Sequence, residues 1–331
     1  MNKFKYYFFL LITTVSLFSC TKDEVAALSP PRDFAVQYPT DIADIEEYLK
    51  AYYIEDVNPD VVTKISKIPT GGNQPSIWTY LNSATFPKLL SRVVVRNDVS
   101  YKLYYLVLRK GTGVSPSSTD AVLTAYRGEY LSRTKVGEVN TLGATFFEES
   151  SSPQTFFNLS STIIGWGQLF PEFKTGTYAP NPDGTISYSN FGAGVLFIPS
   201  GLGYYAQGQN SIPAYAPLVF SIKLYEINRL DNDNDGIPNY LEDLDGDGYM
   251  YNYSNPLIYP TPPADAIRYA DDTDRDGISN FQDTDDDADG VSTRTEITAA
   301  NGTIIPFADI PSCDGNTTNP ARIKRHLVKC N

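Results

Sequence analysis

Four short acidic runs lie between residues 231 and 296, and each alternates aspartate with other residues before ending in Asp-Gly. This stretch contains 18 of the 39 Asp and Glu residues but only three of the arginines, so the formal net charge of −13 arises there. Neighbouring carboxylates repel one another, and a hard divalent cation with oxygen ligands removes that repulsion. We therefore expect bound cations, with a disordered acidic linker as the alternative. No basic stripe offsets the acidic one, which argues against nucleic acid as a partner.

The spacing within the runs is that of a calcium loop, in which glycine permits a sharp turn after three alternating oxygen ligands and further ligands follow. A predicted strand precedes the first run, so the runs resemble thrombospondin type 3 repeats rather than helix-flanked EF-hands. That resemblance implies that structural calcium (Ca2+) forms much of the core; magnesium fits such carboxylate cages less well. The expected metal ligands are Asp231, Asp233, Asp235, Asn239 and Glu242 in the first run, Asp243, Asp245 and Asp247 in the second, Asp272, Asp274, Asp276, Asn280 and Asp283 in the third, and Asp285, Asp287, Asp289 and Glu296 in the fourth.

The N-terminus has the features of a secretory signal. Lys3 and Lys5 precede an apolar run over residues 6–18, which is shorter than the ~20 residues needed to span a bilayer. We expect a signal peptide over residues 1–19, followed directly by Cys20.

Leu17-Phe18-Ser19-Cys20 resembles a bacterial lipobox, and residues 21–24 are similar to the sequence after the lipidated cysteine in surface lipoproteins of Bacteroidetes-like bacteria. The resemblance implies lipidation of Cys20 and an exported protein anchored to the outer membrane, periplasmic or surface-exposed. The alternative is an ordinary signal peptide with an incidental cysteine.

Once Cys20 is set aside, Cys313 and Cys330 remain as an even pair in an oxidising compartment. A disulfide between them is the favoured interpretation, with free thiols as the alternative. His326 is the only histidine and lies in a basic tail, which argues against a catalytic histidine or a His-ligated metal.

Periodicity divides the rest of the chain. We expect a lipidated tether over 20–40, a mixed segment over 41–95, a sheet domain over 96–228, acidic repeats over 229–296 and a tail over 297–331. Helical spacing predicts a helix over Asp41–Ile54 with Asp41 as its N-cap. Segments rich in β-branched and aromatic residues predict strands at 102–109, 121–131, 194–198 and 218–227, with one short helix near 167–173. This order indicates an α+β fold in which an antiparallel sheet wraps around a single helix.

A succession of motifs runs from residue 104 to 227. It comprises Leu108-Arg109-Lys110-Gly111-Thr112-Gly113, Tyr126-Arg127-Gly128, Phe147-Glu148-Glu149-Ser150, Phe157-Asn158-Leu159, Ile163-Ile164-Gly165-Trp166, Phe173-Lys174-Thr175-Gly176, Ile198-Pro199-Ser200, Leu202-Gly203-Tyr204, Ile212-Pro213 and Leu218-Val219-Phe220. In this order they resemble FKBP-type peptidyl-prolyl cis-trans isomerases.

The resemblance implies an FKBP-like fold and isomerisation of X-Pro bonds in proline-containing polypeptides, without nucleophile or metal. Trp166 would form the pocket floor, Tyr204 would offer its hydroxyl to a substrate carbonyl, and the Ile163 backbone N–H would hold another carbonyl. The implied walls are Tyr126, Phe147, Ile163, Ile212 and Phe220, with Glu148 where the family usually has Asp. Taken singly, each aromatic residue could equally be core packing.

Several positions depart from the family pattern. Glu148 is one methylene longer than Asp, Thr162 replaces an apolar residue, and Ser211 replaces a rim isoleucine. Residues 178–190 form an insertion that we expect to be a hairpin or flap. These changes leave a second hypothesis open: a non-catalytic, peptide-binding or adhesin-like surface lipoprotein that keeps the fold.

Overall fold

The computed structural model describes residues 30–330, so the predicted signal peptide and Cys20 lie outside the described part of the chain. Within that part, none of the helices combines the length and the apolar character needed to cross a membrane.

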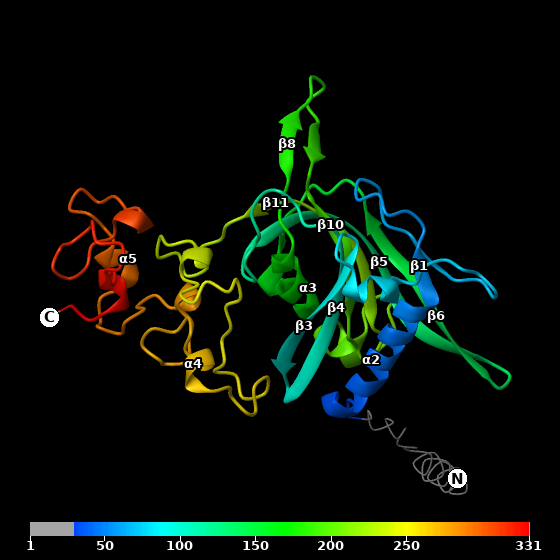
Figure 1. The fold of residues 1–331 in the computed structure, drawn as a ribbon. Helices are drawn as coiled ribbons and strands as arrows, with labels where there is room; N and C mark the ends of the chain where they lie inside the picture. The colour runs from blue at the N-terminus through cyan, green and yellow to red at the C-terminus, as the bar shows by residue number, and fades with distance from the viewer. Residues whose placement is uncertain (1–29, 331) are drawn as a thin grey trace, which may run out of the picture. The chain divides into compact units, whose positions relative to one another are not determined.

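A seven-stranded antiparallel sheet organises the chain up to residue 228 (Figure 1). Its order is β3-β4-β10-β11-β5-β6, and the short β7 pairs with β5. Each of the four predicted strands is present, and the predicted flap is the hairpin β8–β9. The strands are β3 (Lys88–Arg96), β4 (Val99–Arg109), β5 (Ala121–Val136), β6 (Val139–Ser150), β7 (Phe157–Asn158), β8 (Thr177–Pro180), β9 (Ile186–Ser189), β10 (Gly192–Ile198) and β11 (Leu218–Asn228).

The helices are short apart from the first. The predicted helix near 167–173 begins earlier, as α3, and continues as a 3₁₀ turn, η3. The fold is therefore α+β. The helical segments are α2 (Phe34–Ala51), α3 (Ile164–Leu169), α4 (Asp265–Arg268) and α5 (Thr293–Glu296), with 3₁₀ turns η1 (Ile77–Asn82), η2 (Leu159–Ser161), η3 (Phe170–Glu172), η4 (Ser200–Leu202), η5 (Tyr205–Gln207), η6 (Asn239–Leu241), η7 (Asn280–Gln282), η8 (Phe307–Asp309) and η9 (Arg325–Leu327).

The sheet wraps around α3, as expected, and its opposite face is covered by α2. Alternate residues of β4 enter two different cores: Leu103 and Tyr105 pack on the α3 side, whereas Tyr104 and Leu106 pack on the α2 side. Successive side chains of a strand point to opposite faces, so a strand buried on both faces reads as a continuous apolar run. Figure 1 shows α2 and α3 flanking the sheet.

The expected start of the first helix at Asp41 is wrong. The helix α2 begins at Phe34, and Asp33 is its N-cap, accepting the Ala35 N–H at 2.7 Å. The helix therefore includes residues expected in the tether and continues through Pro39. Aromatic packing explains the difference, because the Phe34 ring stacks on Tyr205 with ring centroids 4.1 Å apart.

The expected boundary between residues 95 and 96 falls inside a hairpin. The strand β3 pairs along its whole length with β4, so the segment before residue 96 contributes an edge strand to the same sheet. The short strands β1 (Tyr52–Ile54) and β2 (Ile65–Lys67) form a separate two-stranded ladder after α2.

The chain after residue 230 is loop-rich, as expected, and its longest helix has four residues. Its small apolar core consists of Ile237, Ile297 and Ile310. Because Ile297 and Ile310 belong to the expected tail, the tail and the acidic repeats share one core instead of forming separate segments.

Candidate functional site

A hollow of about 550 Å³ opens beside α3 on one face of the sheet. Six of the eight predicted pocket residues line it, and they come from β5, β6, α3 with its N-cap, the turn after η4, and β11. Of the other lining residues, Phe157, Ile164 and Gly203 stood in the quoted motifs and Thr162 among the departures from the family pattern, without a predicted role as pocket walls. The lining comprises Tyr126, Glu148, Ile163, Trp166, Tyr204 and Phe220 from the prediction, together with Phe157, Ser161, Thr162, Ile164 and Gly203.

Trp166 lies at the centre of the aromatic cluster and is only 4% exposed. Its ring meets four others edge-on, at centroid distances of 5.2–5.6 Å: those of Tyr126, Phe157, Phe170 and Phe220. Edge-to-face contacts of this kind stabilise a defined ring arrangement beyond simple burial. The predicted floor residue is thus held rigidly, and its Nε1 is buried without a hydrogen-bond partner.

The two remaining predicted pocket residues, Phe147 and Ile212, are not among the residues that line the hollow. Phe147 packs edge-on against Phe220, with centroids 5.7 Å apart, and its ring covers Gly128. A Cβ on Gly128 would lie 2.3 Å from that ring, which explains why glycine stands there. Ile212 is buried in the core on the α3 side. Both residues pack behind the lining, and their contact with a substrate stays a prediction.

Glu148 is the acidic group of the pocket and lies opposite Gly128 in the pairing of β5 with β6. Burial, followed by hydrogen bonding with Glu148, raises the pKa of the Tyr126 hydroxyl. Burial and the charge of Glu148 also raise the pKa of Tyr204. Both tyrosines therefore remain protonated at neutral pH. The Tyr126 hydroxyl donates to Glu148, whereas the Tyr204 hydroxyl can donate to a peptide carbonyl.

A larger hollow of about 900 Å³ lies under the hairpin β8–β9. Phe156, which directly precedes the motif Phe157-Asn158-Leu159, lines this second hollow and not the first. The second hollow shares no lining residue with the Trp166 pocket.

The four acidic runs repeat one backbone arrangement. In each run the carboxylate of the first Asp accepts a hydrogen bond from the backbone N–H of the glycine. The carboxylate of the second Asp accepts from the backbone N–H of the third Asp. The carboxylate of the third Asp accepts from the backbone N–H of the residue that follows the glycine. The four glycines all have positive φ, between 86° and 108°, a region that glycine adopts without strain. Each run is therefore a closed turn in which every one of the three carboxylates has at least one oxygen bonded to backbone, and Asp243, Asp272 and Asp285 have both.

Asn239 and Asn280, the two amides among the expected metal ligands, bond to the backbone of their own runs. The side-chain oxygen of Asn239 accepts the Asn232 N–H at 2.9 Å, and that of Asn280 accepts the Thr273 N–H at 3.0 Å. These amides close the turn behind the carboxylates. Asn and Asp side chains bond readily to nearby backbone, and spacing alone does not separate this role from coordination.

The carboxylates of the runs gather into groups whose oxygens lie within 4.8 Å of one another. Three groups are the predicted Asp triplets of the first, third and fourth runs. The second run gathers Asp243 and Asp245 with Asp271, whose carboxylate also accepts the Leu244 N–H at 2.8 Å. Asp271 was not predicted, because it stands directly before the third run; the only signal was an aspartate pair at 271–272.

The late carboxylates of the other runs lie near their own Asp triplets. Burial is the main cause that raises the pKa of Glu242 in the first run, Asp283 in the third and Glu296 in the fourth. The negative charges of neighbouring aspartates raise these pKa values further. The pKa of Glu242 rises to about 11 and that of Glu296 to about 7.

The donor set fits a hard cation. Several carboxylate oxygens are buried without a hydrogen-bond partner, and buried anionic oxygens without partners are costly. Calcium takes oxygen ligands at flexible geometry, so these oxygens suit it. The atoms are Asp231 Oδ1, Asp233 Oδ2, Asp235 Oδ2, Asp287 Oδ2, both side-chain oxygens of Glu242 and both of Asp286.

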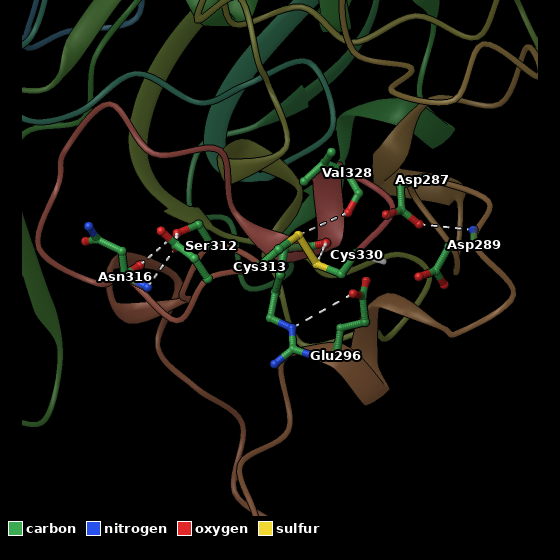
Figure 2. Close-up of a disulfide and its surroundings, with 10 residues drawn as sticks. Asp287, Asp289, Glu296, Ser312, Cys313, Asn316, Val328 and Cys330 are labelled. Atoms are coloured by element: carbon green, nitrogen blue, oxygen red, sulfur yellow. Dashed lines mark hydrogen bonds and ion pairs between the residues drawn. A yellow bond between two sulfur atoms is a disulfide. The ribbon is translucent and has the colours of Figure 1, made fainter.

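A disulfide joins Cys313 and Cys330, with their Cα atoms 5.4 Å apart. Figure 2 shows it next to Glu296 and the fourth run. The Arg325 guanidinium lies 3.9 Å from the Glu296 carboxylate, and Lys329 donates to the Ala288 carbonyl at 2.8 Å. The bridged tail is thereby attached to the last acidic loop.

Comparison with known proteins matches two regions of the chain. A family model described as the BamM C-terminal region matches residues 232–320. The FKBP-type peptidyl-prolyl cis-trans isomerase FkpA of Aeromonas hydrophila is 32% identical over 139 residues, which cover 40% of this chain and 41% of that protein. The chain thus spans about two fifths of the length of this curated relative.

Two solved structures are also similar. A peptidyl-prolyl cis-trans isomerase of Pseudomonas syringae pv. tomato has 26% identity, with 38% of this chain and 76% of that chain covered and a TM-score of 0.28. FkpA of Escherichia coli has 23% identity, with 46% and 55% covered and a TM-score of 0.29. Over 40% of its length, the chain is therefore similar in sequence to an FKBP-type peptidyl-prolyl cis-trans isomerase.

Proposed function

We propose that this chain is a peptidyl-prolyl cis-trans isomerase that acts on X-Pro bonds of exported proteins. The observation that carries the proposal is the aromatic pocket with Trp166 at its centre, in a chain similar to an FKBP-type isomerase.

The chemistry requires no nucleophile. Rotation about an X-Pro bond is slow because amide resonance imposes a barrier of ~18–20 kcal/mol. Water stabilises the planar, charge-separated amide through its carbonyl oxygen. An apolar pocket removes that water and favours the twisted, less polar amide, so the pocket binds the transition state more tightly than the ground state. Trp166, Phe157 and Phe220 provide apolar walls, and the protonated Tyr204 hydroxyl provides a donor at the rim.

A protease-coupled isomerisation assay tests the proposal on the purified chain without residues 1–20. We expect acceleration of a proline-containing peptide, and loss of it in Trp166→Ala, because four ring contacts hold the pocket floor. Phe156→Ala is the matched control, since Phe156 lines the other hollow. Wild-type protein with no acceleration would contradict the enzymatic proposal.

The second candidate is a peptide-binding module without catalysis. The glutamate in the pocket, next to Thr162, favours it, since a more polar pocket favours the twisted amide less. Binding of a proline-containing peptide without acceleration, measured by fluorescence of Trp166, would select this candidate over the first.

We further propose that the acidic runs bind structural calcium and that a lipid on Cys20 anchors the chain to the outer membrane, facing the periplasm or the surface. The buried, unpartnered carboxylate oxygens support the first of these proposals. Support for the second is the lipobox-like sequence. Metabolic labelling with a fatty-acid analogue, compared between wild type and Cys20→Ser, tests the anchor; label retained in the variant would contradict it.

A further inference from the structure

Three carboxylates from two different runs meet in the interior of the C-terminal segment. Asp235 and Glu242 belong to the first run and Asp286 to the fourth, and one oxygen of each lies within 4.8 Å of the others. Asp235 and Glu242 are 2% exposed and Asp286 is 1% exposed. This trio differs from the triplets within runs because every member is buried.

The oxygens of the trio are left without donors. Both side-chain oxygens of Glu242, both of Asp286 and Oδ2 of Asp235 are buried and unpartnered. The other oxygen of Asp235 accepts the Ile237 N–H at 2.6 Å.

No cationic side chain neutralises the trio within residues 30–330: none of its members takes part in an ion pair there. Arg294 is the near candidate, but its guanidinium donates to the Asn234 carbonyl at 2.9 Å. Buried carboxylates this close together are costly unless a cation or protons are shared among them.

The surrounding structure holds the two runs in position independently of the trio. The bond from Arg294 to Asn234 joins the fourth run to the first. Ile237, the residue after the glycine of the first run, packs on Ile297, which follows the fourth run. The trio therefore lies on a framework that is already assembled.

Asp286 is also distinctive in the repeat. It stands between the first two aspartates of its run, where the other runs have Asn232, Leu244 and Thr273. The Asp286 carboxylate does not help to close the turn of its own run. The bond that closes this turn runs from the backbone N–H of Asp286 to the Thr293 hydroxyl, at 3.2 Å. The side chain is directed to the first run instead.

We propose that Asp286, with Asp235 and Glu242, forms a divalent-cation site shared between the first and fourth runs. This proposal rests on the proposed calcium binding of the segment. It adds a site that the spacing of the aspartates within a single run does not predict. Oxygen-only ligands with no histidine or cysteine favour calcium over transition metals. The ion joins two segments distant in sequence and closes the C-terminal segment into one unit.

Calorimetric titration of the chelator-treated full chain with CaCl2 tests the site. We expect Asp286→Asn to lose one bound ion or to bind it at least about 10-fold more weakly, since even groups that only support a metal ligand cost this much when removed. In the presence of calcium, backbone hydrogen exchange should be faster in Asp286→Asn than in wild type, both in residues 231–242 and in residues 284–293. The control is Asp265→Asn, which removes the same charge from an exposed carboxylate in the same segment and should change neither measurement.

The outcomes separate the two proposals. A wild-type chain that binds no calcium would overturn both. A wild-type chain that binds calcium, with Asp286→Asn binding the same number of ions equally well, would overturn the shared site alone. Melting temperatures give a further test. Asp286→Asn should have a lower melting temperature than wild type in calcium, but not in chelator. A lower melting temperature in both conditions would overturn the site, because it would assign Asp286 a packing role.

Discussion

Glu148 and the two tyrosines beside it give the pocket a polar rim around an aromatic floor. Tyr126 and Tyr204 both have raised pKa values, from burial first and from Glu148 second. Their hydroxyls therefore stay protonated, while Trp166 and Phe220 remain packed edge-on.

His326 provides a pH test of the C-terminal segment. It is 1% exposed, and burial, followed by the charge of Lys324, lowers its pKa to about 4. The folded state thus disfavours the charged imidazolium. As the pH falls from about 6.5 towards 4, the unfolded chain takes up the proton first, and this residue costs about 1.4 kcal/mol of stability per pH unit.

We therefore expect His326→Gln to flatten the loss of stability between pH 6.5 and pH 4. Urea unfolding of wild type and variant across this range measures the difference, which separates His326 from the carboxylates titrating in both proteins. Parallel curves for the two proteins would show that His326 is protonated in the folded state.

At the scale of elements, α2 is tied to the sheet through a buried carboxylate. Asp41 is 1% exposed and accepts hydrogen bonds from the Gln37 amide at 2.7 Å, and from the Ser200 N–H and hydroxyl at 2.8 and 2.6 Å. The same residue was expected to cap a helix, a role that Asp33 fills. It links α2 to the turn η4, which precedes Tyr204.

Asp41→Ala should destabilise the chain by about 1–3 kcal/mol or more, because it leaves the N–H and the hydroxyl of Ser200 buried without this acceptor. Denaturant unfolding measures the loss. A double-mutant cycle with Ser200→Ala should be non-additive, and strict additivity would mean that the bond contributes no stability.

The second acidic run is in contact with the helix that carries Trp166. The Tyr249 hydroxyl donates to the Gln168 carbonyl at 3.2 Å and to the Glu172 carboxylate at 3.1 Å. The Ser118 N–H donates to the Gly248 carbonyl at 2.9 Å, and the Arg92 guanidinium lies 3.3 Å from the centroid of the Tyr249 ring. The run thus supports α3 from the side away from the pocket lining.

Tyr249→Phe should lower stability by about 0.5–1.5 kcal/mol, or more because one acceptor is charged, and should reduce the isomerisation rate by loosening α3. Thermal melting and the protease-coupled assay measure the two effects. Tyr240→Phe is the control, since that residue is exposed. Unchanged melting and rate in Tyr249→Phe would mean that the contact is not coupled to the pocket.

At the scale of the whole molecule, two kinds of interior stand in one chain. The two large apolar cores draw on residues 34–227. The segment after 230 has a small cluster of three isoleucines, the further buried residues Tyr249, Met250, Tyr259 and Phe281, and many buried carboxylates. Hydrophobic burial stabilises the first part, and bound ions are the proposed stabiliser of the second.

Chelation should therefore act on one part of the chain. Each ion at 100 times its dissociation constant stabilises the folded segment by about 2.7 kcal/mol, and EDTA removes that contribution. We expect limited proteolysis in EDTA to cut within residues 231–296, with the sheet domain left intact, and excess calcium to restore protection. Magnesium is the control ion and should restore less. Cleavage that is independent of calcium would contradict the structural role.

Much of the fold could be anticipated because strand and turn signals are local. The four predicted strands, the short helix and the flap are present, since β-branched runs and Gly/Pro clusters act within a few residues. The strand β3 and the N-terminal half of α2 were missed. Their positions depend on pairing with β4 and on stacking against Tyr205, contacts that connect distant parts of the chain.

Sequence by itself determined the acidic loops, four of the sheet strands and six of the eight predicted pocket residues, because each follows from a short motif whose geometry is set by its own backbone. Tertiary structure alone decided that Phe147 and Ile212 pack behind the lining of the hollow. It also brought Asp271 to the second run and Asp286 to the first. The physical reason is the same in each case: a motif fixes which groups a loop offers, whereas folding brings distant loops together and so decides which groups meet.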